Sequence, residues 1–167
     1  LQWTDEHVVA EQTARESIEI FDQTAPPMYP DRVQTEVRLA DALFLQNRLE
    51  EAGSIFTETL QKSTELFGRD SVEVADILDK LAMVSYSQRR FGDAERHSRD
   101  AEATAQVAYG DRHALTASMA TTLGRTLSER RKYSEAETTL REAPGIFDET
   151  VPTAHQYVAS TRDFLGE

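Results

Sequence analysis

A spacing of 42 residues recurs along this chain of 167 residues and constrains its fold more than any other feature. Leu49, Phe91 and Tyr133 lie 42 apart, and each is followed two and three residues later by an acidic residue and an alanine. A second row of leucines, each followed by alanine or glycine, has the same interval and comprises Leu39, Leu81, Leu123 and Leu165. Such self-similarity is typical of stacked repeats, in which each unit buries its apolar face on its neighbours.

The middle copy of the repeat predicts a helical hairpin. Residues 76–88 carry an apolar stripe with the spacing of a helix, formed by Ile77, Leu78, Leu81, Ala82 and Tyr86. We expect a turn at 89–92 and a second helix over 93–109, closed by Gly110 because glycine commonly follows a helix end. No segment alternates polar and apolar residues over the length of a strand, so we expect no sheet.

Small residues recur at two fixed places in the repeat and favour close helix packing. They are Ala40, Ala82 and Gly124 in the first helices and Ala52, Ala94 and Ala136 in the second helices. We therefore expect an all-α solenoid of antiparallel helical hairpins, held together by packing between hairpins more than by helix propensity. The expected repeats are 33–74, 75–116 and 117–158, with partial copies at 1–32 and 159–167. Because both ends fall in mid-repeat, we expect one repeat domain cut from a longer protein.

Two places depart from the regular repeat. His7 occupies the position of Leu49 and Phe91, so we expect it at the turn of the first partial hairpin. Pro144 and Gly145 lie deep in the second helix of the third copy. Because proline removes an amide donor and clashes with the preceding turn, we expect that helix to end or kink near Ala143.

The repeat resembles the tetratricopeptide repeat. The resemblance is carried by Leu-Ala in the first helix, an aromatic residue or leucine at the turn, and the acidic-Ala pair after it. The 42-residue period and the linker YGDRHALTA at 109–117 are similar to the kinesin-light-chain-like subclass. The resemblance implies a right-handed superhelix and a protein-interaction module. Members often carry asparagine at groove positions, where this chain has Val37, Asp79 and Thr121, so their peptide-recognition rules do not transfer.

Composition excludes several classes of partner. The chain has 18 basic and 30 acidic residues and a net charge of −12, a surface that repels nucleic acid. It has no cysteine, so a disulfide framework and thiolate metal sites are impossible. That composition suits a cytoplasmic protein. Its apolar runs are too short to insert into a membrane.

Candidate catalytic or metal-binding groups are sparse. The four histidines lack an i, i+4 pair, so we expect no metal site and no cofactor. His113 and His155, one period apart, suggest a capping or turn role, and His97 suggests a partly buried, hydrogen-bonded side chain. No serine elbow, cysteine nucleophile or phosphate-binding glycine loop is present, so we expect no enzymatic activity in this chain.

A groove lined by the first helices is the candidate binding site. Its expected lining is Val37, Asp41, Phe44 and Leu45 from one copy, Asp76, Asp79, Met83 and Tyr86 from the next, and Thr121, Arg125, Ser128 and Glu129 from the third. Phe44, Met83 and Tyr86 would be exposed apolar anchors flanked by carboxylates. This composition suits a peptide or protein segment with apolar and basic side chains. The same residues could instead pack on neighbouring helices.

Two further hypotheses remain open. The chain could be a structural spacer or self-association arm of a larger signalling protein, with no peptide ligand. In addition, basic residues gather at the turns between first and second helices, namely Arg48, Arg89, Arg90, Arg130, Arg131 and Lys132. They could form a ridge for an anionic partner, or simply complement the negative ends of the preceding helices.

Overall fold

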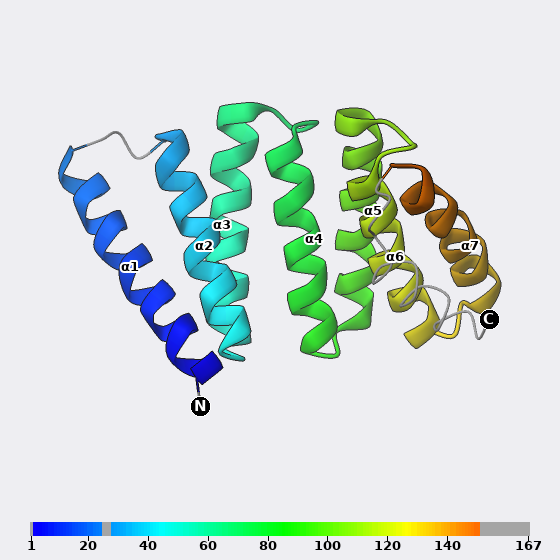
Figure 1. The fold of residues 1–167 in the computed structure, drawn as a ribbon, viewed down its shortest axis with the longest axis horizontal. Helices are drawn as coiled ribbons and strands as arrows, with labels where there is room; N and C mark the ends of the chain where they lie inside the picture. Colours follow the sequence, from blue (N-terminus) through cyan, green and yellow to red (C-terminus); the bar gives the residue numbers. More distant parts are fainter. Residues whose placement is uncertain (1, 25–27, 151–167) are drawn as a thin grey trace. The chain divides into compact units, whose positions relative to one another are not determined.

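The computed structural model describes the backbone of residues 2–24 and 28–150, and the side chains of 6–24 and 28–141. All regular structure in these ranges is α-helical (Figure 1). The helices are α1 (Gln2–Thr24), α2 (Pro30–Leu45), α3 (Leu49–Phe67), α4 (Val72–Ser87), α5 (Phe91–Tyr109), α6 (Ala114–Glu129) and α7 (Tyr133–Thr150). The predicted all-α fold is therefore confirmed. The partial copy at 159–167 and His155 lie outside the described residues.

The chain divides into two compact units, Leu1–Arg69 and Asp70–Glu167. In the first unit, α2 packs against both α1 and α3. In the second unit, α4 packs on α5, α5 on α6, and α6 on α7, while α4 also contacts α6. Within the second unit, the first helices of two successive hairpins are therefore neighbours. The exact repeat boundaries and the single-domain assignment stay predictions.

Each hairpin turn contains a residue in the left-handed backbone region. These residues are Asn47 (φ 61°), Arg89 (φ 59°) and Arg131 (φ 60°), which lie one repeat period apart. The following amide closes the turn, as when Arg90 N–H donates to the Ser85 carbonyl at 2.9 Å. The second helices end differently, at Gly68 (φ 89°) and Gly110 (φ 91°). Glycine adopts this conformation without steric cost, so its predicted helix-ending role is confirmed for Gly110.

Small residues bring the helices of each hairpin close together, as the repeat pattern predicted. Ala52 and Ala94 are completely buried, and Ala136 is nearly so. In the third hairpin, a Cβ atom built on Gly124 would lie 2.6 Å from Leu140 Cδ2, so α6 approaches α7 at a place where only glycine fits. Around this contact, Leu123, Leu127 and Ala136 form a buried cluster.

Two predicted interruptions are absent from the described helices. His7 lies within α1, so its predicted place at a turn is wrong. The residues beside it include neither glycine nor proline, and they continue the helix without a break. The predicted helix end near Ala143 is also wrong, because α7 runs through Pro144 to Thr150, whereas a kink at this place stays a prediction. Proline removes one backbone hydrogen bond, whereas the remaining bonds and the packing of α7 on α6 persist.

Candidate functional site on helices α4 and α6

The first helices of the second unit bring several predicted groove residues together. Tyr86 on α4 donates a hydrogen bond from its hydroxyl to Glu129 Oε1 on α6 at 3.1 Å. The guanidinium of Arg125 lies over the Tyr86 ring, 5.3 Å from its centroid. On its other side, Tyr86 makes an edge contact with Phe91, with ring centroids 5.5 Å apart. Tyr86 is thus held from three directions.

The environment of Tyr86 favours its neutral form. Burial, and then the hydrogen bond to the Glu129 carboxylate, raise the pKa of the Tyr86 hydroxyl above its usual value. The phenol therefore stays a hydrogen-bond donor at neutral pH. The cation of Arg125 and the anion of Glu129 compensate each other around the ring, so this end of the face has little net charge.

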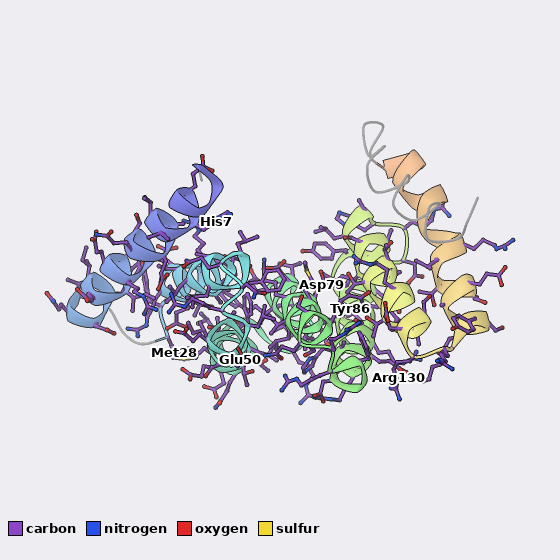
Figure 2. All side chains as sticks on the ribbon, turned by 90° about the horizontal axis from the view of Figure 1, so that it is seen from below. His7, Met28, Glu50, Asp79, Tyr86 and Arg130 are labelled. Carbon is purple, nitrogen blue, oxygen red and sulfur yellow. The ribbon has the colours of Figure 1, made fainter. Side chains whose placement is uncertain are left out.

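Asp79 lies two helical turns before Tyr86 on the same side of α4 (Figure 2). Its Oδ1 atom is buried and has no hydrogen-bond partner among the described residues. Burial raises the pKa of Asp79 to about 6, while a hydrogen bond with the Thr122 side chain on α6 acts in the opposite direction. Asp79 therefore combines a desolvated carboxylate with an unused acceptor atom.

Exposed groups surround these two residues on α4. Met83 lies one helical turn after Asp79 and is 42% exposed. Asp76 is exposed and forms a long ion pair with Lys80, with 4.0 Å between Oδ2 and Nζ. We name this surface the α4–α6 face and define it by Asp76, Asp79, Met83, Tyr86, Arg125 and Glu129.

The other predicted groove residues of the second unit do not present their polar atoms outward. The Thr121 hydroxyl donates to the Ala117 carbonyl at 2.9 Å, and the Ser128 hydroxyl donates to the Gly124 carbonyl at 3.1 Å. Both side chains bond back to their own helix. Their hydroxyl protons are therefore already used within α6.

In the first unit, the predicted groove residues differ in exposure. Val37 is only 6% exposed and belongs to the core, so it offers no binding surface. Asp41 and Phe44 are partly buried, and Leu45 is exposed. The expectation of an exposed apolar anchor therefore fits Met83 well, but fits Phe44 and Tyr86 only in part.

Sequence reasoning missed Thr122 and Lys80 because it compared positions exactly one period apart. Across α4 and α6 the contacts follow a different offset: Tyr86 and Glu129 are 43 residues apart. Asp79 and Thr122 have the same offset. The contacts between α4 and α6 are thus shifted by about one residue relative to the 42-residue period. This shift becomes visible only once a contact between the two helices is known.

The basic residues at the turns mostly pair with carboxylates. Arg130 and Lys132 each contact the buried carboxylate of Glu95 on α5 at 2.6 Å, and Arg99 contacts it at 3.0 Å. We name these four residues the Glu95 cluster; Figure 2 labels Arg130. Burial raises the pKa of Glu95, but the hydrogen bonds from Lys132 and Arg99 outweigh it and leave the pKa below its usual value.

An equivalent cluster exists in the first unit, two repeat periods earlier. Glu11 on α1 accepts from Gln46 at 2.9 Å, from Arg48 at 2.7 Å and from Arg15 at 2.9 Å. The equivalent position between Glu11 and Glu95 is Gly53, which has no carboxylate. Within each unit, a second helix is therefore linked to the next hairpin by ion pairs, made by Arg48 in the first unit and by Arg130 and Lys132 in the second. Arg90 forms a separate ion pair with Asp93 at 3.7 Å. Four of the six turn residues thus take part in ion pairs, and a role of the six in binding an anionic partner stays a hypothesis.

The predictions for His97 and His113 agree with the structure. His113 caps α6 because its Nδ1 accepts from the Leu115 amide at 3.2 Å, and its ring stacks on Tyr109. His97 is partly buried, and its Nδ1 lies 3.3 Å from the Ser85 hydroxyl. In the described part of the chain, no group of three or more acidic or histidine side chains could hold a metal ion. None of the described helices has the length and apolar character needed to cross a membrane.

Comparison with known proteins identifies the fold. A family model described as tetratricopeptide repeat matches residues 31–106 and 73–147. BtubC (BKLC) from P. vanneervenii is 22% identical with a TM-score of 0.80, over 96% of this chain and 67% of that one. A putative kinesin light chain with TPR-like repeats from Podosopora anserina is 15% identical with a TM-score of 0.71, over 96% and 81%.

A third similar structure is a Rap protein complexed with Competence and Sporulation Factor. It is 16% identical with a TM-score of 0.80, over 95% of this chain and 42% of that one, so the chain spans less than half of the Rap protein. A search of curated proteins gives no match. The matched repeats cover most of the sequence. The chain therefore belongs to the tetratricopeptide repeat family, and its fold is similar to the repeats of that putative kinesin light chain.

Proposed function

We propose that this chain binds a peptide or protein segment through the α4–α6 face. Tetratricopeptide repeats are in general non-catalytic scaffolds for protein–protein interaction, and that general role follows from the family. The observation that carries the proposal is the exposed Met83 side chain between the desolvated carboxylate of Asp79 and the held Tyr86 ring. Apolar surface with adjacent polar groups of fixed geometry favours a specific contact.

The charge of the molecule indicates the partner. A net charge of −12 attracts cationic segments and repels anionic ones. Asp76 and Asp79 add negative charge beside Met83, so a segment with both basic and apolar side chains matches the face. Because the helices hold the face in place before binding, less conformational entropy is lost on association.

A role within a larger signalling or regulatory protein is part of this proposal. The similar Rap protein was solved in complex with Competence and Sporulation Factor, and this chain matches under half of that protein. The composition of this chain, which has no cysteine, suits the reducing cytoplasm. The proposal treats the array as the recognition part and places any effector function outside it.

A different candidate function is self-association or a spacer role. It is supported by exposed apolar side chains on α1, where Val8, Val9 and Ile20 are all more than half exposed. Exposed apolar groups on one helix favour contact with another protein surface. Analytical ultracentrifugation of the chain and of a Val9→Glu, Ile20→Glu variant tests it: a dimer that the variant abolishes would support this function.

Panning of a random peptide library on the immobilised chain tests the proposed binding. We expect selected peptides to be rich in lysine or arginine and in apolar residues. Met83→Glu should weaken their affinity at least about tenfold, because it places a charge at the apolar centre of the face. Val107→Glu is the matched control, since Val107 is 69% exposed on α5 of the same unit. Equal loss in both variants, or no selected peptide, would contradict the proposal.

A further inference from the structure

The carboxylate of Asp79 has an acceptor atom that the fold does not use. Its Oδ1 is buried and has no hydrogen-bond partner among the described residues, while the carboxylate hydrogen-bonds the Thr122 side chain. Buried polar atoms in folded proteins are nearly always paired, because an unpaired one loses its hydration without replacement. Each exception therefore calls for an explanation in terms of strain, an unplaced partner or a ligand.

Repeat packing does not explain this carboxylate. The equivalent positions one period before and after Asp79 are Val37 and Thr121, and neither carries a charge. The hairpins built on those residues form the same helices with an apolar or a hydroxyl side chain at this place. A charged group is therefore not needed for helix packing here. Its desolvation opposes ionisation and raises the pKa of Asp79 to about 6, which is a cost to folding at neutral pH.

The surroundings of Asp79 suit an arriving cation. Lys80, the basic residue of α4, forms an ion pair with Asp76 at 4.0 Å, and its positive charge also acts to lower the pKa of Asp79. Arg125 on α6 lies over the ring of Tyr86, which is seven residues after Asp79 on α4. Asp79 as a whole residue is only partly buried, although its Oδ1 atom is buried.

We infer that Asp79 accepts a lysine ammonium from the bound segment, with the lysine methylene chain lying on Met83. The inference rests on the proposed function and adds the residue type that the α4–α6 face selects. Met83 follows Asp79 by four residues, so the two side chains are neighbours on one helix face. An ammonium group can pair with a carboxylate through a single oxygen and carries an apolar stem, which matches one free oxygen beside a methionine.

Arginine is the weaker fit at this site. A guanidinium binds best when it engages both oxygens of a carboxylate at once. In Asp79 the hydrogen bond with Thr122 already uses part of the carboxylate, so a guanidinium in the paired geometry would compete with that bond. Selection of lysine over arginine thus follows from the number of free acceptor atoms.

Four peptide pools test the inference on the intact chain. The pools have random flanking residues and, at the centre, lysine, arginine, norleucine or glutamate. Norleucine keeps the methylene chain and lacks the charge. On the parent chain we expect the lysine pool to bind about tenfold more tightly than the norleucine pool, a usual effect of one desolvated charge pair. The arginine pool should bind less tightly than the lysine pool.

Two substitutions localise the effect. Asp79→Asn keeps the shape of the side chain and removes its charge, and Asp79→Thr introduces the residue of the next repeat. Both variants should keep full helicity and a melting temperature at least equal to that of the parent, because each removes a charge whose burial opposes ionisation. In both, the lysine and norleucine pools should bind equally.

The outcomes separate the inference from the proposed function. If Met83→Glu abolishes binding but the parent chain does not distinguish lysine from norleucine, the Asp79 assignment is overturned and the binding face stands. A lysine preference that persists in both Asp79 variants also overturns the assignment. If no pool binds the parent chain, both the face and the assignment fail.

Discussion

Gly124 governs how closely α6 approaches α7. A Cβ atom at this position would lie 2.6 Å from Leu140 Cδ2, well inside van der Waals contact. Leu140 is buried and cannot move into solvent without opening the core. The first-helix alanines of the other hairpins, Ala40 and Ala82, are both completely buried. The third hairpin therefore packs more tightly at this point than a repeat with alanine would allow.

Gly124→Ala should destabilise the chain by about 1–3 kcal/mol, because the added methyl group forces Leu140 out of its place. The free energy of unfolding from urea titration measures the effect. Combining Gly124→Ala with Leu140→Val, which removes one methylene near the overlap, should recover part of the loss. If the free energies of unfolding lost in the two single variants simply add in the double variant, a direct steric contact between these residues is contradicted.

His97 makes the stability of the second unit depend on pH. Burial lowers the pKa of His97, Arg96 lowers it further, and Asp93, Asp100 and the Leu81 backbone act in the opposite direction. The unfolded chain therefore takes up a proton at higher pH than the folded chain does. Stability is complete above the unfolded-state pKa of about 6.5 and falls as pH decreases through that value towards the lower folded-state pKa.

The measurement compares the parent chain with His97→Gln, which can still hydrogen-bond Ser85 but does not titrate. Between about pH 7.5 and about pH 5.5, the parent should lose up to about 1 kcal/mol more unfolding free energy than the variant. Parallel pH profiles for the two proteins would show that His97 makes no contribution.

At the scale of elements, the Glu95 cluster fastens α5 to the hairpin of α6 and α7. Arg130 ends α6, Lys132 precedes α7, and both donate to one carboxylate on α5. One buried anion thus positions two helix ends. The Glu11 cluster does the same for α1 and α2 through Gln46 and Arg48.

Glu95→Gln should destabilise the chain by about 1–2 kcal/mol, less than for a fully buried pair because the three cations are about 40% exposed. Thermal unfolding at neutral pH measures it. The variant should also lose less stability than the parent on acidification below about pH 4.5, where a carboxylate with a lowered pKa ceases to contribute. Glu11→Gln is the matched substitution in the first unit. If Glu95→Ala is no worse than an exposed Glu137→Ala, the cluster does not stabilise the hairpin.

At the scale of the whole molecule, the surplus of negative charge should govern association with a cationic segment. Raising NaCl from about 20 mM to about 300 mM should weaken the affinity of the lysine pool by about tenfold, because salt screens the attraction. Fluorescence anisotropy at several salt concentrations provides the measurement, with the norleucine pool as control. Equal salt dependence for the two pools would argue against a charge pair.

The repeat period was enough to predict the helical hairpins, because it reflects packing that every copy shares. Leu81, Ala82 and Ala94 are buried as their recurrence predicted. Single-copy features were less predictable. The unused oxygen of Asp79 and its contact with Thr122 depend on how α6 is shifted against α4, and nothing in the period encodes that shift. The helix through Pro144 likewise reflects packing that outweighs one lost hydrogen bond.

The turns at Asn47, Arg89 and Arg131 have a practical consequence for protein engineering. Each holds a non-glycine residue in a conformation that costs an arginine about 1 kcal/mol more than a glycine. Relief of this backbone strain would therefore add stability at three equivalent turn positions. Two of these residues are exposed arginines, and glycine in their place should raise the melting temperature of the array.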